Sequence, residues 1–378
     1  MTRAYLDHAS STPLRPAALE AMLPFLAEHA GDPARLHAEG RVTRVAVEDA
    51  REHVAALLGA RPREVVFTSS GTEAVNHAIW GGARRAGLGG GIITTAVEHS
   101  SVLDACRREP GTLTIVGVDG VGRFDPDEIA AAIDDDTVLV SVQLANHEVG
   151  TVQPAAAVCE HARERGLLVH VDACTAAGHV PLDFAALGAD LVSVSAHKLG
   201  GPKGVGALLV RRGLRIPPLI IGGAQERERR GGLENVPAIV GFGAAAAELT
   251  GDDRLCTEAR AARRLTEEVA RGALTAVPGT VQYGDPELRV PHLVCLGIEG
   301  VEAEPILLAL DQHGIAVHSG SACSSEALEP SPVLEAMGAD ADRSMRVSVG
   351  WSSTEGDVTK LLGALPGIVG SLRALRAP

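Results

Sequence analysis

Between residues 64 and 210, short apolar runs alternate with longer amphipathic runs that are rich in alanine. Apolar runs of this length are typical of buried strands, whereas the alanine-rich runs have the length and spacing of helices. Strands that alternate with helices form a mostly parallel sheet, because each crossover helix returns the chain to the same end of the sheet. The pattern therefore predicts an α/β fold.

The strands predicted on this basis are 64–70, 91–97, 112–118, 137–145, 167–173, 190–196 and 204–210. The predicted helices are 71–87, 125–133 and 154–166. A proline near the first turn of the second helix is typical of a helix start. Beyond them, a helical pattern over about 236–275 leads into further apolar runs at 292–298, 314–320 and 345–351. We expect residues 13–250 to form a large domain, and residues 1–12 with 251–378 to form a smaller α+β domain.

Charge and composition narrow the classes of partner. The chain has 378 residues and a net charge of −14, which argues against a nucleic-acid ligand because phosphate binding needs a basic surface. No run approaches the roughly 20 consecutive apolar residues that span a bilayer. The N-terminal residues lack the apolar core of a signal peptide, so we expect a cytoplasmic protein without a membrane partner.

The six cysteines favour free thiols over disulfides or metal ligands. They show no CxxC pair and no spacing typical of a metal site, so we predict no metal. In a cytosolic chain such cysteines are generally reduced.

Several polar clusters follow the predicted strands, where open α/β sheets bind their ligands. "SSGTEA" joins a strand to a helix start, so the N–H groups of Gly71 and Thr72 could bind a phosphate, although an ordinary capped helix explains the same letters. Asp172 closes the strand "LLVHVDA". It could pair with the protonated ring nitrogen of a pyridoxal cofactor or cap a turn.

Lysine is rare in this chain, and one lysine follows a strand directly. Only Lys198, Lys203 and Lys360 occur, and the other 31 of 34 basic residues are arginine. A lysine amine can lose its proton and form a Schiff base, which a guanidinium cannot do. Lys198 ends the apolar run "VSVSAHK", whereas Lys203 lies in a Gly/Pro turn and is expected to face solvent. Pyridoxal phosphate requires a phosphate-binding helix start, an aspartate at a strand end and a lysine amine. The sequence offers all three.

Ten motifs, in order along nearly the whole chain, resemble those of the cysteine desulfurases, which are class V aminotransferase-like pyridoxal enzymes of fold type I. They are "YLDHASSTPLRP", "RLHAEGR", "VVFTSSGTEAVNHAI", "VEHSSV", "ANHEVGTVQP", "VDACTAAGHVPLD", "SVSAHKLGGPKGVGALLVR", "GGAQERERRGGLENV", "SGSACSSEALEPSPVL" and "MRVSVGWSST". The "SGSAC" form is similar to that of the nitrogen-fixation and iron–sulfur-cluster group. The resemblance implies a homodimer with a large domain built on a mostly parallel seven-stranded sheet sandwiched by helices, plus a smaller α+β domain.

The resemblance also implies residue roles. Lys198 would hold pyridoxal 5'-phosphate, His99 would stack on its ring, and Asp172 would bind its ring nitrogen. Other positions implied to bind the cofactor are Gly71, Thr72, Thr175, Ser195 and His197. Asn146 would face the cofactor or substrate, and Arg346 would bind the substrate carboxylate through its planar fork.

Cys323 would be the nucleophile that takes sulfur from L-cysteine, leaving a persulfide and L-alanine. Lys198 would take the Cα proton, and His99 is a candidate base for the thiol. A sulfur-acceptor protein would then receive the sulfur. The sequence leaves open whether that sulfur serves iron–sulfur clusters, tRNA thiolation, DNA phosphorothioation or natural products.

The chain departs from the family pattern at four positions. His147 stands where a second Asn is common, and Thr175 stands where a Gln normally reaches the ring oxygen. Leu233 replaces a Thr that reaches the partner subunit's cofactor phosphate, and Trp351 replaces an Arg. These departures bear on rate and substrate choice. A selenocysteine lyase, another carbon–sulfur lyase or a class V aminotransferase is the alternative enzyme, and a sulfur carrier without turnover is the alternative outside enzymes.

Overall fold

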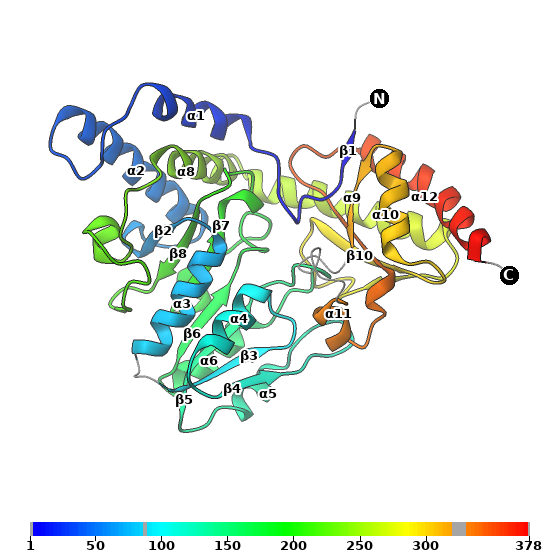
Figure 1. Cartoon of the computed structure of the whole chain (residues 1–378), viewed down its shortest axis with the longest axis horizontal. Coiled ribbons are helices and arrows are strands. Elements are labelled where there is room, and N and C mark those ends of the chain that lie inside the picture. Colours follow the sequence, from blue (N-terminus) through cyan, green and yellow to red (C-terminus); the bar gives the residue numbers. More distant parts are fainter. Residues whose placement is uncertain (1–2, 86–88, 320–329, 377–378) are drawn as a thin grey trace.

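A computed structural model of the chain describes residues 3–85, 89–319 and 330–376. A seven-stranded sheet lies at the centre of its larger part (Figure 1) and has the order β2-β8-β7-β6-β5-β3-β4. The strands are β2 (Val65–Thr68), β3 (Gly91–Thr95), β4 (Leu113–Val116), β5 (Thr137–Gln143), β6 (Leu168–Asp172), β7 (Leu191–Ser195) and β8 (Gly206–Val210). Strand β8 runs antiparallel to both neighbours, and the other pairs are parallel. The predicted α/β fold with a mostly parallel seven-stranded sheet is confirmed.

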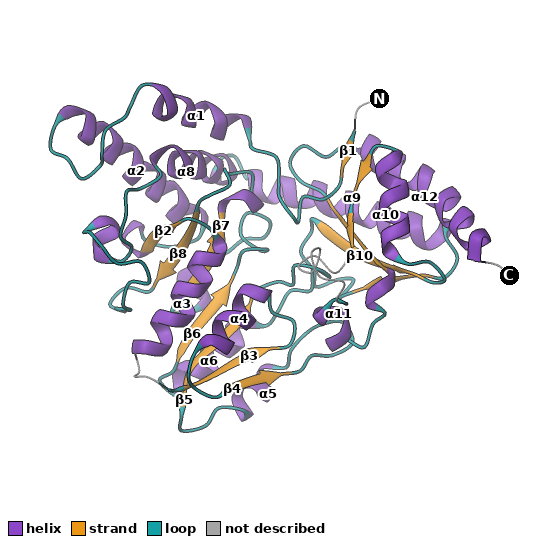
Figure 2. Ribbon diagram, viewed as in Figure 1, coloured by secondary structure: helices purple, strands orange, loops and turns teal. Residues whose placement is uncertain are grey.

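Helices cover both faces of this sheet (Figure 2), which explains why its strands are almost entirely apolar. Helices α3 (Gly71–Arg85) and α4 (Ser100–Arg108) pack on one face, where Ile92 and Leu139 point toward them. The alternate residues Ile93 and Val140 point into the core on the other face. The remaining helices of this part are α1 (Pro16–Ala27), α2 (Ala38–Leu57), α5 (Pro126–Ala131), α6 (Ala155–Glu164), α7 (Phe184–Leu187) and α8 (Val236–Thr250). Pro126 begins α5, as expected, and Asp125 caps it.

A second, antiparallel sheet has the order β12-β13-β10-β9. Its strands are β9 (Thr280–Tyr283), β10 (Leu293–Ile298), β12 (His318–Ser319) and β13 (Ser344–Ser348). Helices α9 (Arg254–Ala276), α10 (Ala303–Gln312) and α12 (Glu355–Arg376) pack with it around a separate core. Strand β1 (Ala4–Tyr5) pairs in parallel with β11 (Ile315–Ala316), which ties the N-terminal segment to this part of the molecule.

Two predicted elements are divided in the structure. The helical pattern over 236–275 forms two helices, because the chain turns at Asp252 and Asp253, whose φ angles are positive. The run at 314–320 contains β11, which pairs with β1, and β12, which pairs with β13. The proposed domain division at residue 250 stays a prediction.

Helix α12 satisfies a test of length and composition for crossing a membrane over residues Glu355–Leu375. Part of this helix packs inside the protein, since Val358, Leu361 and Leu365 lie in the core beneath the second sheet.

The far face of the second sheet contacts the loops of the first. Cys295 of β10 packs with Val97 and Val149, which follow β3 and β5, and with Leu334 of α11 (Pro332–Ala336). This contact places β13 beside the carboxyl ends of the parallel strands.

Candidate active site

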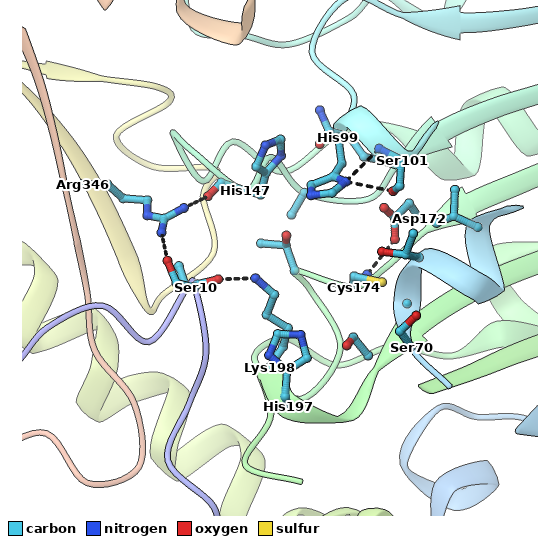
Figure 3. Close-up of a pocket in the computed structure, with 18 residues that line it drawn as sticks. Ser10, Ser70, His99, Ser101, His147, Asp172, Cys174, His197, Lys198 and Arg346 are labelled. Atoms are coloured by element: carbon cyan, nitrogen blue, oxygen red, sulfur yellow. Dashed lines mark hydrogen bonds between the residues drawn. The ribbon is translucent and has the colours of Figure 1, made fainter. Parts of the chain in front are cut away.

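A cavity of about 290 Å³ lies at the carboxyl ends of β5, β6 and β7 (Figure 3). Side chains from the N-terminal segment, from the large sheet and its helices, and from β13 surround it. The lining residues are Ala9, Ser10, Ser70, Gly71, Thr72, Val75, His99, Ser101, Gln143, Ala145, His147, Asp172, Cys174, Thr175, Ser195, His197, Lys198 and Arg346. Nine predicted site residues are therefore brought together: Gly71, Thr72, His99, Asp172, Thr175, Ser195, His197, Lys198 and Arg346.

The N-terminus of α3 forms one wall of the cavity. Ser70 caps this helix by accepting a 3.1 Å hydrogen bond from the Glu73 N–H, and Gly71 and Thr72 follow on the cavity wall. A Cβ atom on Gly71 would lie 2.6 Å from Sγ of Cys174 and 3.1 Å from Cβ of Ser195. Glycine is therefore the residue that leaves this space open for an anionic group beside the helix end.

Asp172 ends β6 and is held by two hydrogen bonds. Its Oδ1 accepts from Oγ of Ser193 at 2.9 Å and from the Cys174 N–H at 3.0 Å. Burial raises the pKa of the Asp172 carboxyl, but His170 and the hydrogen bonds at Cys174 outweigh burial and leave that pKa below its ordinary value. An ionised, buried carboxylate suits a cationic partner such as a protonated ring nitrogen.

Lys198 lies in the short 3₁₀ turn that follows β7, with its side chain directed into the cavity (Figure 3). Its ammonium donates to the carbonyl oxygen of Ala9, and its own carbonyl accepts from Nε2 of His179 at 2.9 Å. Gly200, with φ of +89°, turns the chain immediately after it. Lys203 is exposed, as expected.

His197 and His99 lie on opposite sides of Lys198 in Figure 3. Burial, together with the positive charges of Lys198 and Lys203, lowers the pKa of His197 from 6.5 to about 4. Its buried Nδ1 has no hydrogen-bond partner among the described residues. Nδ1 of His99 accepts a 3.1 Å hydrogen bond from the Ser101 N–H, so the hydrogen of a neutral His99 ring lies on Nε2.

Arg346 enters the cavity from β13 and is only 1% exposed. Its Nη1 donates to the carbonyl oxygen of His147 at 2.9 Å, and its Nη2 donates to Asp7 at 3.0 Å and to Ser10 at 2.7 Å. A guanidinium has five N–H groups, so these three bonds leave one N–H of Nη1 and the buried Nε–H, which has no partner among the described residues.

The predicted contact of Asn146 with the cofactor or substrate stays a prediction, and the structure places Asn146 behind the residues that line the cavity. Asn146 is fully buried and does not line the cavity. Its Oδ1 accepts from the N–H groups of Glu148 and Val149 at 2.8 Å each, and its Nδ2 donates to the carbonyl oxygen of Val97 at 3.1 Å. Asn146 therefore fixes the turn after β5, and the next residue, His147, faces the cavity.

The other three residues that depart from the family pattern lie in different parts of the structure. Thr175 lines the cavity, whereas Leu233 is 65% exposed and borders a second cavity beside Ser69 and Arg230. Nε1 of Trp351 donates to the carbonyl oxygen of Pro13 at 2.9 Å, and the Arg15 guanidinium lies 5.9 Å from the Trp351 ring centre.

Sequence reasoning missed Ala9, Ser10 and Cys174 as cavity residues. Ala9 and Ser10 come from a segment more than 180 residues before Lys198, and no local pattern places them there. Cys174 could have been noticed as a thiol two residues after Asp172. Cys323, the predicted nucleophile, lies outside the described residues.

The residues of the cavity fit pyridoxal phosphate. The space kept open by Gly71, the unpartnered Nδ1 of His197 and the ionised carboxylate of Asp172 match the phosphate and ring nitrogen of that cofactor. Lys198 supplies the amine for its aldehyde. These features fit an α/β enzyme of the kind that carries a phosphate-bearing cofactor on a lysine.

The chain belongs to the class V aminotransferases: the family model described as "Aminotransferase class-V" matches residues 4–361. This family is generally dependent on pyridoxal phosphate. A protein named cysteine desulfurase from Trichormus azollae is 42% identical over 382 residues, covering 99% of this chain and 95% of that protein. Cysteine desulfurase IscS from Methanosarcina thermophila is also 42% identical, over 98% of this chain and 92% of that protein.

Two solved structures are similar over nearly the whole chain. A NifS-like protein has a TM-score of 0.90 and 33% identity, covering 98% of this chain and 100% of that chain. SspA in complex with cysteine has a TM-score of 0.80 and 28% identity, covering 93% of this chain and 100% of that chain.

Proposed function

We propose that this protein is a pyridoxal-phosphate-dependent cysteine desulfurase that converts L-cysteine to L-alanine and holds the sulfur as a persulfide on Cys323. The observation that carries the proposal is the convergence of Lys198, Asp172, His99 and Arg346 on one cavity. Relatives named cysteine desulfurase, which match almost the whole chain, support the same activity.

The cofactor would be held by residues with separate tasks. Gly71, Thr72, Ser195 and His197 line the cavity and would hold the phosphate, and Asp172 would bind the ring nitrogen. When bound, pyridoxal phosphate supplies an electron sink for the bonds at the substrate Cα. The amine of Lys198 anchors the aldehyde and afterwards holds the proton that leaves Cα.

The chain's own residues prepare the substrate for sulfur transfer. Arg346 binds the cysteine carboxylate, while Asp7 and the carbonyl oxygen of His147 keep the guanidinium in place. His99, fixed through Nδ1, presents Nε2 for proton transfer with a thiol. The sulfur of Cys323 then forms a bond to the substrate sulfur as the Cβ–S bond breaks, and the remaining carbon skeleton leaves as L-alanine.

We further propose that the protein is a homodimer. Exposed aliphatic side chains concentrate on α1, the start of α2 and the loop over 216–235, which also carries Leu233: Leu19, Leu23, Leu26, Leu36, Val42, Val45, Ile220, Ile221 and Leu233. A surface of this kind is typical of a permanent subunit interface. We also propose that this protein lies in the cytoplasm and that it passes its sulfur to an acceptor protein.

The test is turnover of L-cysteine by purified protein, with L-alanine and protein-bound persulfide measured separately. We expect equal amounts of alanine and persulfide in the first turnover. Cys323→Ser should retain the cofactor absorbance but lose the persulfide, and Lys198→Ala should lose alanine formation. Undiminished alanine production by Cys323→Ser would contradict the proposal. Faster turnover of selenocysteine, or transamination instead of sulfur release, would favour the alternative enzymes.

A further inference from the structure

A buried histidine–glutamate pair lies directly beside the active-site cavity. His147 lines the cavity, and its Nε2 lies 3.5 Å from Oε1 of Glu148, whose side chain is 1% exposed. Figure 3 shows the His147 ring between His99 and Arg346. A histidine paired with a carboxylate is a common acid/base arrangement in enzymes.

The backbone of the turn around the pair is held by hydrogen bonds on two sides. Asn146 accepts hydrogen bonds from the backbone N–H groups of Glu148 and Val149, and its own carbonyl oxygen accepts from Gly150 at 3.1 Å. Arg346 holds the His147 carbonyl oxygen from the opposite side. The backbone positions from which the His147 and Glu148 side chains extend are therefore fixed by the chain itself.

The carboxylate of Glu148 is buried and has one basic neighbour. Its Oε2 accepts from Oγ of Ser331, which also caps α11 by accepting from the Leu334 N–H at 3.1 Å. Among the described residues, His147 is the one basic side chain within 4.0 Å of the Glu148 carboxylate. A buried carboxylate without a cation costs several kcal/mol. A positive charge on the His147 imidazole therefore stabilises the pair.

The same imidazole contacts the established acid/base candidate of the cavity. The rings of His147 and His99 pack edge to face, with centres 5.1 Å apart and planes at 66°. Among the described residues, the other charged or titratable groups near the pair are Arg346, the buried Glu98 and the buried Cys295 thiol. Two adjacent imidazolium rings repel each other, so a proton placed on one ring favours a neutral form of the other.

We propose that His147 is an acid/base residue of this active site and that Glu148 is its positioning residue. The proposal rests on the proposed desulfurase function. Formation of the persulfide removes one proton from the Cys323 thiol, whose sulfur electron pair forms the S–S bond. The electron pair of the breaking Cβ–S bond stays on carbon, and that carbon takes one proton to become the methyl group of alanine. His147 holds the proton between these two events, and Glu148 stabilises the imidazolium.

The first arm of the test measures the imidazole itself and does not depend on activity. NMR spectra of the full-length protein, labelled with ¹³C-histidine, are recorded across pH, and His147→Asn assigns the signal by its disappearance. Glu148→Gln should lower the titration midpoint of His147 by about one pH unit or more. The surface pair His161–Asp127, 3.3 Å apart, provides the control, and His161→Asn should leave the His147 signal unchanged. The same His147 midpoint in wild type and Glu148→Gln would overturn the proposal.

The second arm measures turnover of L-cysteine. His147→Asn should lower kcat at least tenfold, with KM within threefold, and should remove one ionisation from the pH profile of kcat. Glu148→Gln should have a smaller effect in the same direction, and the double variant should be no slower than His147→Asn alone. Thermal melting checks that each variant is folded.

The outcomes separate this inference from the proposed function. A wild-type protein that makes no alanine from cysteine contradicts the proposed function, while the NMR arm still tests the pair. An active wild type whose His147→Asn variant keeps kcat and both ionisations contradicts this inference alone.

Discussion

The Nη1 of Arg346 donates a 2.9 Å hydrogen bond to the backbone carbonyl oxygen of His147. This bond joins strand β13 of the second sheet to the turn that follows β5 of the first. The residue proposed to bind the substrate carboxylate is therefore held by the part of the chain that also forms the opposite wall of the cavity.

Arg346→Lys should lower kcat/KM for L-cysteine by about a hundredfold, mainly through KM. A lysine ammonium cannot reproduce the planar fork that contacts His147, Asp7 and Ser10 at the same time. Steady-state kinetics check this. As a control, Arg343→Lys, at an exposed pair with Asp340, should behave like wild type. An unchanged KM in Arg346→Lys would argue against the carboxylate role.

Gly71→Ala should weaken the binding of pyridoxal phosphate at least tenfold. The added methyl group would lie 2.6 Å from Sγ of Cys174, so it must displace that side chain or enter the space for the phosphate. Titration of the cofactor into the resolved apoprotein measures the effect, and Cys174→Ala should restore part of the affinity. Gly363→Ala, in α12 where a Cβ meets nothing within 4 Å, should leave cofactor affinity intact. Wild-type affinity in Gly71→Ala would show that the phosphate lies elsewhere.

Glu226→Ala should destabilise the protein by about 3–5 kcal/mol, because it leaves the buried Arg51 guanidinium with only the half-exposed Glu48 as an ionic partner. The Arg51 and Glu226 side chains are 3% and 2% exposed, and Arg51 binds both carboxylate oxygens, at 2.7 and 2.8 Å. Urea denaturation checks this value. For comparison, Arg107→Ala at the exposed pair with Asp104 should change stability by less than about 1 kcal/mol. Equal losses at the two sites would contradict the expected role of burial.

Glu98→Gln should reduce the pH dependence of stability between pH 6.5 and 8. Burial raises the pKa of the Glu98 carboxyl from 4.5 to about 8, so the native protein keeps a proton that the unfolded chain has lost. Stability therefore falls as pH rises through this range, by about 1–2 kcal/mol for one such group. Burial lowers the pKa of His8 from 6.5 to about 4. Buried histidines of this kind change the stability of the protein only below pH 6.5, so they do not obscure the effect of Glu98 between pH 6.5 and 8. Melting temperatures of wild type and variant across the window test the idea, and parallel pH profiles would refute it.

The sequence alone was sufficient to predict the main sheet and most of the cavity. Strands buried on both faces leave continuous apolar runs, and these runs predicted the strands from β2 to β8 because helices cover both sides of the sheet. Lys198 was identified by its chemistry, since a reactive amine stands out among 31 arginines. Parallel strands place their carboxyl ends together, so strand-end residues such as Asp172 and Lys198 were expected to converge.

The tertiary structure decided the features that depend on distant parts of the chain. Strand β8 runs antiparallel to its neighbours, and Ala9 and Ser10 line the same cavity as Lys198. Arg51 pairs with Glu226, which lies 175 residues further along the chain. The tertiary structure also chose between the neighbours Asn146 and His147, because hydrogen bonds within the turn bury the first and direct the second into the cavity. Local periodicity and side-chain chemistry can be read from short stretches of sequence. Which of two adjacent side chains faces the cavity also depends on distant contacts, such as the hydrogen bond from Asn146 to Val97, 49 residues away, which no short stretch contains.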